Sequence, residues 1–297
     1  MASLLERLAQ GEVLVGDGAM GTMLIERGLK LGECPERWNL DRPEVLSEIA
    51  RLYAEAGADM VETNTFGGSP LKLAQYGLDG RTEEINASAV RAARLGVGHK
   101  VMLAASIGPS GRLLKPYGDT DQDEMRASFT RQLRAVLDEG IDAVVIETMT
   151  DLTEASLAIQ AAKTLDPSLP VIATMTFDAT PRGFFTMMGV SVEQAAERLS
   201  SAGADVIGSN CGNGIDNMVR IAAEFRRFSA RPVIIQANAG LPRIENGVAV
   251  YPESPEFMAG RVPALLDIGV NIVGGCCGTT PTHVNAIYRS VRQYFQK

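Results

Sequence analysis

This 297-residue chain lacks the features that mark membrane, secreted and nucleic-acid-binding proteins. It has no run of 18 apolar residues, which excludes a membrane-spanning helix. Its first ten residues, MASLLERLAQ, mix acid and base with leucine and do not form the apolar core of a secretion signal. The formal net charge of −8 argues against nucleic acid or an anionic membrane as a partner. We therefore expect a cytoplasmic protein that binds neither.

Cysteine and histidine are also scarce, with four and two residues. Four cysteines in a chain of this length do not make the disulfide framework of a small secreted domain. Cys276 and Cys277 are nevertheless neighbours in GGCCGTTP, and Cys211 lies in NCGNG. Cys34 lies in LGECPERWNL, away from any predicted strand end, so we interpret it as structural or free. We expect the two histidines to be surface or packing residues.

Short β-type runs alternate with longer segments of helical periodicity. Eight strands are predicted, at residues 13–17, 59–63, 101–106, 143–147, 171–176, 206–209, 233–237 and 272–274. Amphipathic helices are predicted between them, among others at 42–56, 126–139, 153–162, 192–201 and 217–227. Eight such units without a compositional break predict an α/β fold, a single (β/α)8 TIM barrel over residues 1–297. The alternative is a doubly wound open sheet, but no G-x-G-x-x-G follows the first strand.

Three cysteines follow strands of this predicted barrel, Cys211 after the sixth and Cys276 with Cys277 after the eighth. The carboxyl ends of all strands share one face of a barrel, where active sites lie. Three protein ligands and one open position is the arrangement of a catalytic zinc ion, and the flanking glycines permit the sharp turn that adjacent ligands need. The sequence therefore predicts a Zn²⁺ site on this face. The alternatives are a disulfide between neighbours, disfavoured in a reducing compartment, and inert buried thiols.

The charge of such a site indicates its chemistry. Three thiolates around Zn²⁺ leave a net charge of −1, which makes the ion a poor activator of water. The same site suits a fourth sulfur, because zinc displaces the thiol proton and the sulfur stays nucleophilic. The pattern thus favours alkylation of a small-molecule thiol over hydrolysis.

Seven motifs occur in order along the chain: DGAMGT, ETNTFG, IGPSG, ETMTD, NCGNG, NAGLP and GGCCGTTP. Together they resemble the homocysteine S-methyltransferase family, in particular the homocysteine-binding barrel of cobalamin-dependent methionine synthases. The resemblance runs from residue 17 to about residue 284. It implies that Cys211, Cys276 and Cys277 hold Zn²⁺ and act in catalysis. It also implies that the sulfur of homocysteine takes the fourth position and is methylated, which gives methionine.

The resemblance implies further roles around the metal. Asp17 and Glu147 match the acids that bind the substrate ammonium group, and the backbone amides of Gly18 and Ala19 match those that hold its carboxylate. Asn238 matches a residue near the metal that orients or transiently ligates it. Each assignment has an alternative from the residues alone: solvated loop acids for Asp17 and Glu147, and a turn asparagine before Ala-Gly for Asn238.

The chain departs from the family pattern in places. Ala237 stands where the family commonly has proline, and Phe184–Met188 is more apolar than expected, so it could line another pocket or a docking surface. The sequence reaches Lys297 without folate, cobalamin or activation segments. We therefore expect the methyl group to come from methylcobalamin on a separate corrinoid protein. Two other functions stay open: a corrinoid-system subunit that uses another thiol or methyl donor, and a zinc-holding barrel that binds without catalysis.

Overall fold

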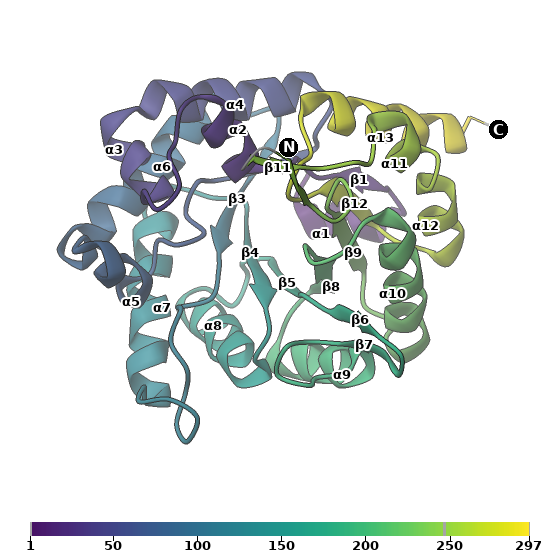
Figure 1. Cartoon of the computed structure of the whole chain (residues 1–297). Coiled ribbons are helices and arrows are strands. Elements are labelled where there is room, and N and C mark those ends of the chain that lie inside the picture. Colours follow the sequence, from purple (N-terminus) through teal and green to yellow (C-terminus); the bar gives the residue numbers. More distant parts are fainter. Residues whose placement is uncertain (1, 246–247, 297) are drawn as a thin grey trace.

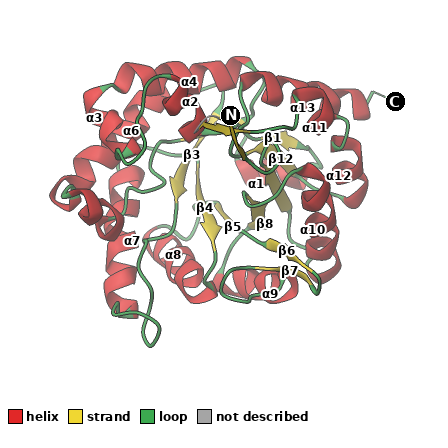
Figure 2. Ribbon diagram, in the orientation of Figure 1, coloured by secondary structure: helices red, strands yellow, loops and turns green. Residues whose placement is uncertain are grey.

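The computed structural model describes residues 2–245 and 248–296. Eight parallel strands form a nearly closed barrel inside a ring of helices (Figures 1 and 2). The predicted α/β TIM barrel is therefore confirmed. Each predicted strand coincides with one of the barrel strands, which are β1 (Leu14–Val15), β2 (Met60–Glu62), β3 (Met102–Ile107), β4 (Ala143–Met149), β5 (Val171–Met175), β8 (Val206–Asn210), β9 (Val233–Ala237) and β12 (Ile272–Gly275).

Except for α1, which lies across the amino-terminal end of the barrel, the helices surround the strands (Figure 2), and the five predicted ones that are given above correspond to α4, α7, α8, α9 and α10. No helix in the described part of the chain is long and apolar enough to cross a membrane. The helices are α1 (Leu4–Ala9), α2 (Met20–Glu26), α3 (Trp38–Asp41), α4 (Pro43–Glu55), α5 (Pro70–Leu73), α6 (Thr82–Val97), α7 (Gln122–Leu137), α8 (Leu152–Leu165), α9 (Val192–Ala202), α10 (Ile215–Phe228), α11 (Pro255–Ala259), α12 (Val262–Ile268) and α13 (Pro281–Tyr294), with single 3₁₀ turns at 35–37, 74–76 and 79–81.

Apolar side chains fill the barrel interior at its amino-terminal end. Leu4 and Leu8 of α1 join a buried cluster with inward-facing strand residues such as Met60 and Ile234. Burying a leucine or methionine side chain contributes about 1.5–3 kcal/mol to folding. The amino-terminal end of the barrel is therefore filled by side chains, and a cavity lies at the carboxyl ends of the strands.

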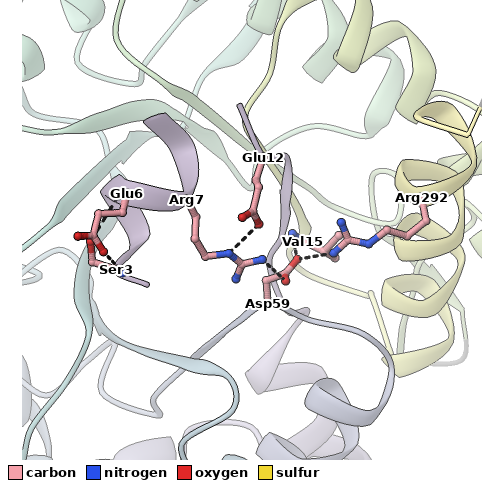
Figure 3. A network of polar contacts seen from close by, with 7 residues as sticks. All are labelled: Ser3, Glu6, Arg7, Glu12, Val15, Asp59 and Arg292. Carbon is pink, nitrogen blue, oxygen red and sulfur yellow. Dashed lines mark hydrogen bonds and ion pairs between the residues drawn. The ribbon is translucent and has the colours of Figure 1, made fainter. Parts of the chain in front are cut away.

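The barrel closes between β1 and β2. Among the described residues, these two strands are joined by one isolated parallel bridge, between Gly16 and Met60. Asp59 reinforces this seam (Figure 3): its Oδ2 accepts the Val15 N–H at 2.9 Å, and its own N–H donates to the Val15 carbonyl at 2.7 Å. Arg7 donates to Asp59 at 2.7 Å, and Arg292 donates to it at 3.3 Å. One carboxylate thus joins α1, β1, β2 and α13.

Two antiparallel ribbons interrupt the alternation of strand and helix, and the sequence analysis did not predict them. They are β6 (Asp178–Thr180) with β7 (Gly183–Phe185), and β10 (Arg243–Glu245) with β11 (Val248–Val250). The apolar segment Phe184–Met188 belongs to the first ribbon and its exit. Phe184 is buried, and the Arg220 guanidinium carbon lies 4.9 Å from the centre of its ring. Met187 is 82% exposed, so the apolar side chains of the segment do not share one environment.

Candidate metal and substrate site

The structure brings together the three cysteines that the sequence predicted as ligands. The sulfur atoms of Cys211, Cys276 and Cys277 all lie within 4.8 Å of one another, at the carboxyl ends of β8 and β12. All three are free, half-buried thiols, which rules out a disulfide in this structure. Cys34 is buried elsewhere and donates to Glu36 at 3.2 Å. That the cluster holds a metal stays a prediction at this point.

Backbone strain concentrates at these cysteines and at the neighbouring acid. Among the described residues, Thr148 and Cys211 are the two non-glycine residues with positive φ, +59° and +58°. Such conformations cost about 1–3 kcal/mol each and persist where the surroundings enforce them. Thr148 follows Glu147, and Cys211 is followed by a left-handed glycine. The strained positions therefore lie at or next to two residues that line the same cavity, Glu147 and Cys211.

The turn that carries the cysteine pair is held by a buried hydroxyl that the sequence analysis missed. Thr279 donates to the Cys276 carbonyl at 2.7 Å and accepts the N–H of Ala19 at 3.2 Å. The Cys276 N–H donates in turn to the Ala237 carbonyl at 2.7 Å. The TTP end of the GGCCGTTP motif was the signal available for this role. Thr279 joins the first βα loop to the last.

Two of the predicted substrate residues lie on that first loop. A Cβ atom at Gly18 would stand 2.8 Å from the Thr279 hydroxyl, so only glycine fits this approach. The Ala19 amide already donates to Thr279. A substrate carboxylate at this place would compete with Thr279 for the Ala19 N–H, while it meets the Gly18 backbone along the wall of the cavity. The carboxylate roles of Gly18 and Ala19 stay predictions.

A cavity of about 250 Å³ lies beside the cysteines. No lysine, arginine or histidine is among the described residues that line it, so its charged groups are all acidic. Three of its acids are Asp17, Glu62 and Glu147. Ser106, Gln236 and the three cysteines line the same cavity.

Asp17 and Glu147 are buried, which contradicts their interpretation as solvated loop acids. Burial raises the pKa of Asp17 to about 7, and the charge of Glu147 contributes to the rise. Burial also raises the pKa of Glu147, although Ser106 donates a hydrogen bond to its carboxylate and Asn210 donates another at 2.9 Å. Two buried acids that resist ionisation are suited to a cationic partner. Their assignment to the substrate ammonium group stays a prediction.

The sequence analysis missed a third acid, Glu62 at the end of β2. Its carboxylate accepts the Gln236 Nε2–H at 2.8 Å, and its backbone N–H donates to Asp17 at 2.8 Å. Burial and the charges of Glu147 and Asp17 raise the pKa of Glu62 well above its usual value. The signal was present in the ETNTFG motif, as an acid at a strand end.

The donor set around the cysteines fits a zinc ion. Sulfurs bound to tetrahedral zinc at about 2.3 Å stand about 3.8 Å apart, and the sulfurs of Cys211 and Cys277 are 3.7 Å apart. Hydrogen bonds from Cys276 and Cys277 lower the pKa of Cys211, which favours its thiolate form, the form that binds a metal. Asn238 is buried beside Cys211, and its Oδ1 has no hydrogen-bond partner. Three cysteine sulfurs with a fourth position left over form the donor set of a catalytic zinc site.

Comparison with known proteins places this arrangement in a family. The model of the family described as homocysteine S-methyltransferase matches residues 14–291. Methionine synthases of Mycobacterium leprae and Mycobacterium tuberculosis are 34% and 35% identical over 305 aligned residues that cover 97% of this chain. The chain spans 25% of the length of each of these relatives. The metallated homocysteine methyltransferase MmuM of Escherichia coli shares the fold, with a TM-score of 0.77 at 22% identity over 95% of this chain and 97% of that one.

Proposed function

The chain belongs to the homocysteine S-methyltransferase family, and from this premise we propose that it is a zinc-dependent enzyme that methylates the sulfur of homocysteine to give methionine. The observation that carries the proposal is the group of three thiols within 4.8 Å of one another beside an acid-lined cavity. A thiol substrate would meet sulfur ligands on one side of the cavity and carboxylates on the other.

Cys211, Cys276 and Cys277 would hold the ion, and Asn238, whose side chain is hydrogen-bonded to Cys211, would lie beside it. When bound, Zn²⁺ supplies a positive centre that keeps a substrate thiol deprotonated. A free thiol has a pKa near 8.5, so only a few per cent is thiolate at pH 7. Asn210 would hold Glu147 close to the metal site, because its amide donates to Glu147 at 2.9 Å and the next residue, Cys211, would be a zinc ligand.

The rest of the substrate is bound by groups of the chain. Asp17 and Glu147 would accept hydrogen bonds from the ammonium group, and such charge-assisted bonds are the strong ones. The backbone of Gly18 and Ala19 would meet the carboxylate on the wall formed by the first loop. These contacts place the thiol toward the cysteines and keep solvent from the ammonium end of the cavity.

The methyl donor in this proposal is methylcobalamin bound to a corrinoid protein. Support comes from the similarity to methionine synthases, which are the relatives with the higher identity. A reducing compartment would keep the three site thiols free, which is why we place the protein in the cytoplasm. Methyl transfer from free methylcobalamin to a panel of thiols separates homocysteine from another acceptor. A barrel that binds thiols but transfers no methyl group from any donor would be a binding module instead.

The central experiment measures the metal and the thiol proton. The protein should carry about one zinc per chain, and alanine at any of the three cysteines should lower zinc content and abolish transfer, whereas Cys34→Ala should do neither. On addition of homocysteine, zinc-edge X-ray absorption should show the sulfur count rise from three to four. Calorimetry in buffers of different ionisation enthalpy should show release of close to one thiol proton. An unchanged sulfur shell would overturn the proposal.

A further inference from the structure

The acid-lined cavity holds a further acidic side chain, Glu62, beside the two that the proposed ammonium site uses. Asp17, Glu62 and Glu147 line it together, and no cationic side chain is among its described lining residues. Carboxylates that share a poorly solvated space disfavour one another's ionised form. Glu62 is affected by both other acids. Burial raises the pKa of Glu62 well above its usual value, and the charges of Glu147 and Asp17 raise it further.

The position of Glu62 is set by Gln236 from the opposite part of the barrel. Gln236 Nε2 donates to Glu62 Oε1 at 2.8 Å across 174 positions of sequence. Gln236 is 3% exposed, and a Cβ atom at Gly274 would stand 3.1 Å from its Cγ, so the side chain packs where neighbouring strands lack side chains. Its Oε1 is buried without a hydrogen-bond partner. Because the side chain is buried and closely packed, its Nε2 donor holds the Glu62 carboxylate in one position.

We propose that Glu62, oriented by Gln236, is a third carboxylate of the ammonium site and determines the preference for thiols that carry an α-amino group. An ammonium group has three N–H donors, and Asp17, Glu62 and Glu147 offer one acceptor carboxylate for each. The bound cation also offsets the mutual repulsion of the three acids. A thiol without an amine offers neither effect. The inference rests on the proposed function and deepens it.

The test compares two ligands that differ only in the amine, homocysteine and 4-mercaptobutanoate. Their dissociation constants are measured by calorimetry on the zinc-loaded protein and on Glu62→Gln. Loss of one charge-assisted hydrogen bond should weaken homocysteine about 10- to 150-fold and leave 4-mercaptobutanoate unchanged or tighter. Gln236→Leu should reduce the same preference, since it removes the donor that orients Glu62.

Glu36→Gln is the matched control, because Glu36 lines the same cavity but its oxygens already accept the Gly67 N–H at 2.7 Å and the Cys34 S–H at 3.2 Å. The ratio of the two dissociation constants should stay at the wild-type value. Equal weakening of both ligands in Glu62→Gln, or no weakening of homocysteine, would overturn the assignment alone. A wild-type protein that binds neither thiol would overturn the proposed function and this assignment with it.

Discussion

Single residues of the site are held in states that cost free energy without a ligand. Cys211 has a left-handed backbone at φ +58°, and Asp17 and Glu147 are acids buried in a cavity whose described lining has no cation. Such features persist in folded proteins where the rest of the structure enforces them. The residue-scale predictions therefore concern ligand affinity and protonation.

Glu147→Gln should weaken homocysteine binding about 10- to 150-fold, because it removes the charge from one hydrogen bond to the ammonium group. Zinc content should stay at the wild-type level. Glu154→Gln is a suitable control: Glu154 is also a buried acid, but it accepts the Ser110 N–H at 2.7 Å away from the cavity lining. Calorimetry measures all three proteins, and an affinity unaltered by Glu147→Gln would show that this carboxylate does not contact the substrate.

Asp17 should make the stability of the substrate-free protein depend on pH. Burial raises its pKa from 3.8 to about 7, so the folded state holds this proton more tightly than the unfolded chain. The resulting stabilisation is complete below pH 3.8 and is lost as the pH rises to about 7. Asp17→Asn needs no proton and should raise the melting temperature more at pH 8 than at pH 5. The same increment at both values would mean that Asp17 is not the titrating group.

At the scale of elements, the loops after the strands are fastened to one another. The turn between β12 and α13 carries Cys277 and then Gly278, whose φ is +82°. A Cβ atom at Gly278 would stand 2.1 Å from Cγ of Tyr251, which belongs to the segment after β11. The Cys277 carbonyl also accepts the Ala239 N–H at 2.9 Å. The geometry of the cysteine pair therefore depends on a second loop.

Gly278→Ala should destabilise the protein and lower its zinc content, because the new methyl group collides with Tyr251 and displaces Cys277. Gly11→Ala is the matched control: Gly11 has φ +81°, but nothing lies within 4 Å of its added Cβ. The control should lose only about 1–2 kcal/mol for the left-handed backbone and keep its zinc. Urea unfolding and metal analysis distinguish the two variants, and equal losses with full zinc in both would refute the collision.

At the scale of the whole molecule, the seam between β1 and β2 and the cysteine site lie at opposite ends of the barrel. Asp59, before β2, links the first and last helices of the chain through Arg7 and Arg292 (Figure 3). The cysteines follow the carboxyl ends of β8 and β12. Stability and chemistry can therefore be separated by mutation.

Asp59→Ala should lower the free energy of unfolding by about 2–4 kcal/mol, because it removes the acceptor of the Val15 N–H and of Arg7 Nη2 at the seam and leaves Arg7 with Glu12 alone. Both arginine and aspartate side chains are mostly buried there, at 16% and 13% exposure. Urea denaturation measures the loss. Zinc content and homocysteine affinity below the transition should match the wild type; a loss of zinc in the folded state would show that the seam also shapes the site.

The sequence alone determined the eight barrel strands, the five helices α4, α7, α8, α9 and α10, and the group of three cysteines. Hydrophobic periodicity reports on residues a few positions apart and so identifies each strand and helix. Successive strands then lie side by side because β-α-β connections are short and right-handed. Cys211, Cys276 and Cys277 could be grouped because each directly follows a strand. The motif resemblance added Asp17 and Glu147, which line the same cavity in the structure.

Only the tertiary structure decided which distant side chains meet. Gln236 reaches Glu62 across 174 positions, and Asp59 reaches Arg292 across 233. Neither contact can be recognised in the sequence, because hydrophobic periodicity relates only residues that are a few positions apart. Each contact forms only when the barrel closes. The same holds for Thr279, whose hydroxyl joins loops 260 positions apart. Local pattern therefore set where acids and thiols stand along the chain, and barrel closure set which of them share a cavity.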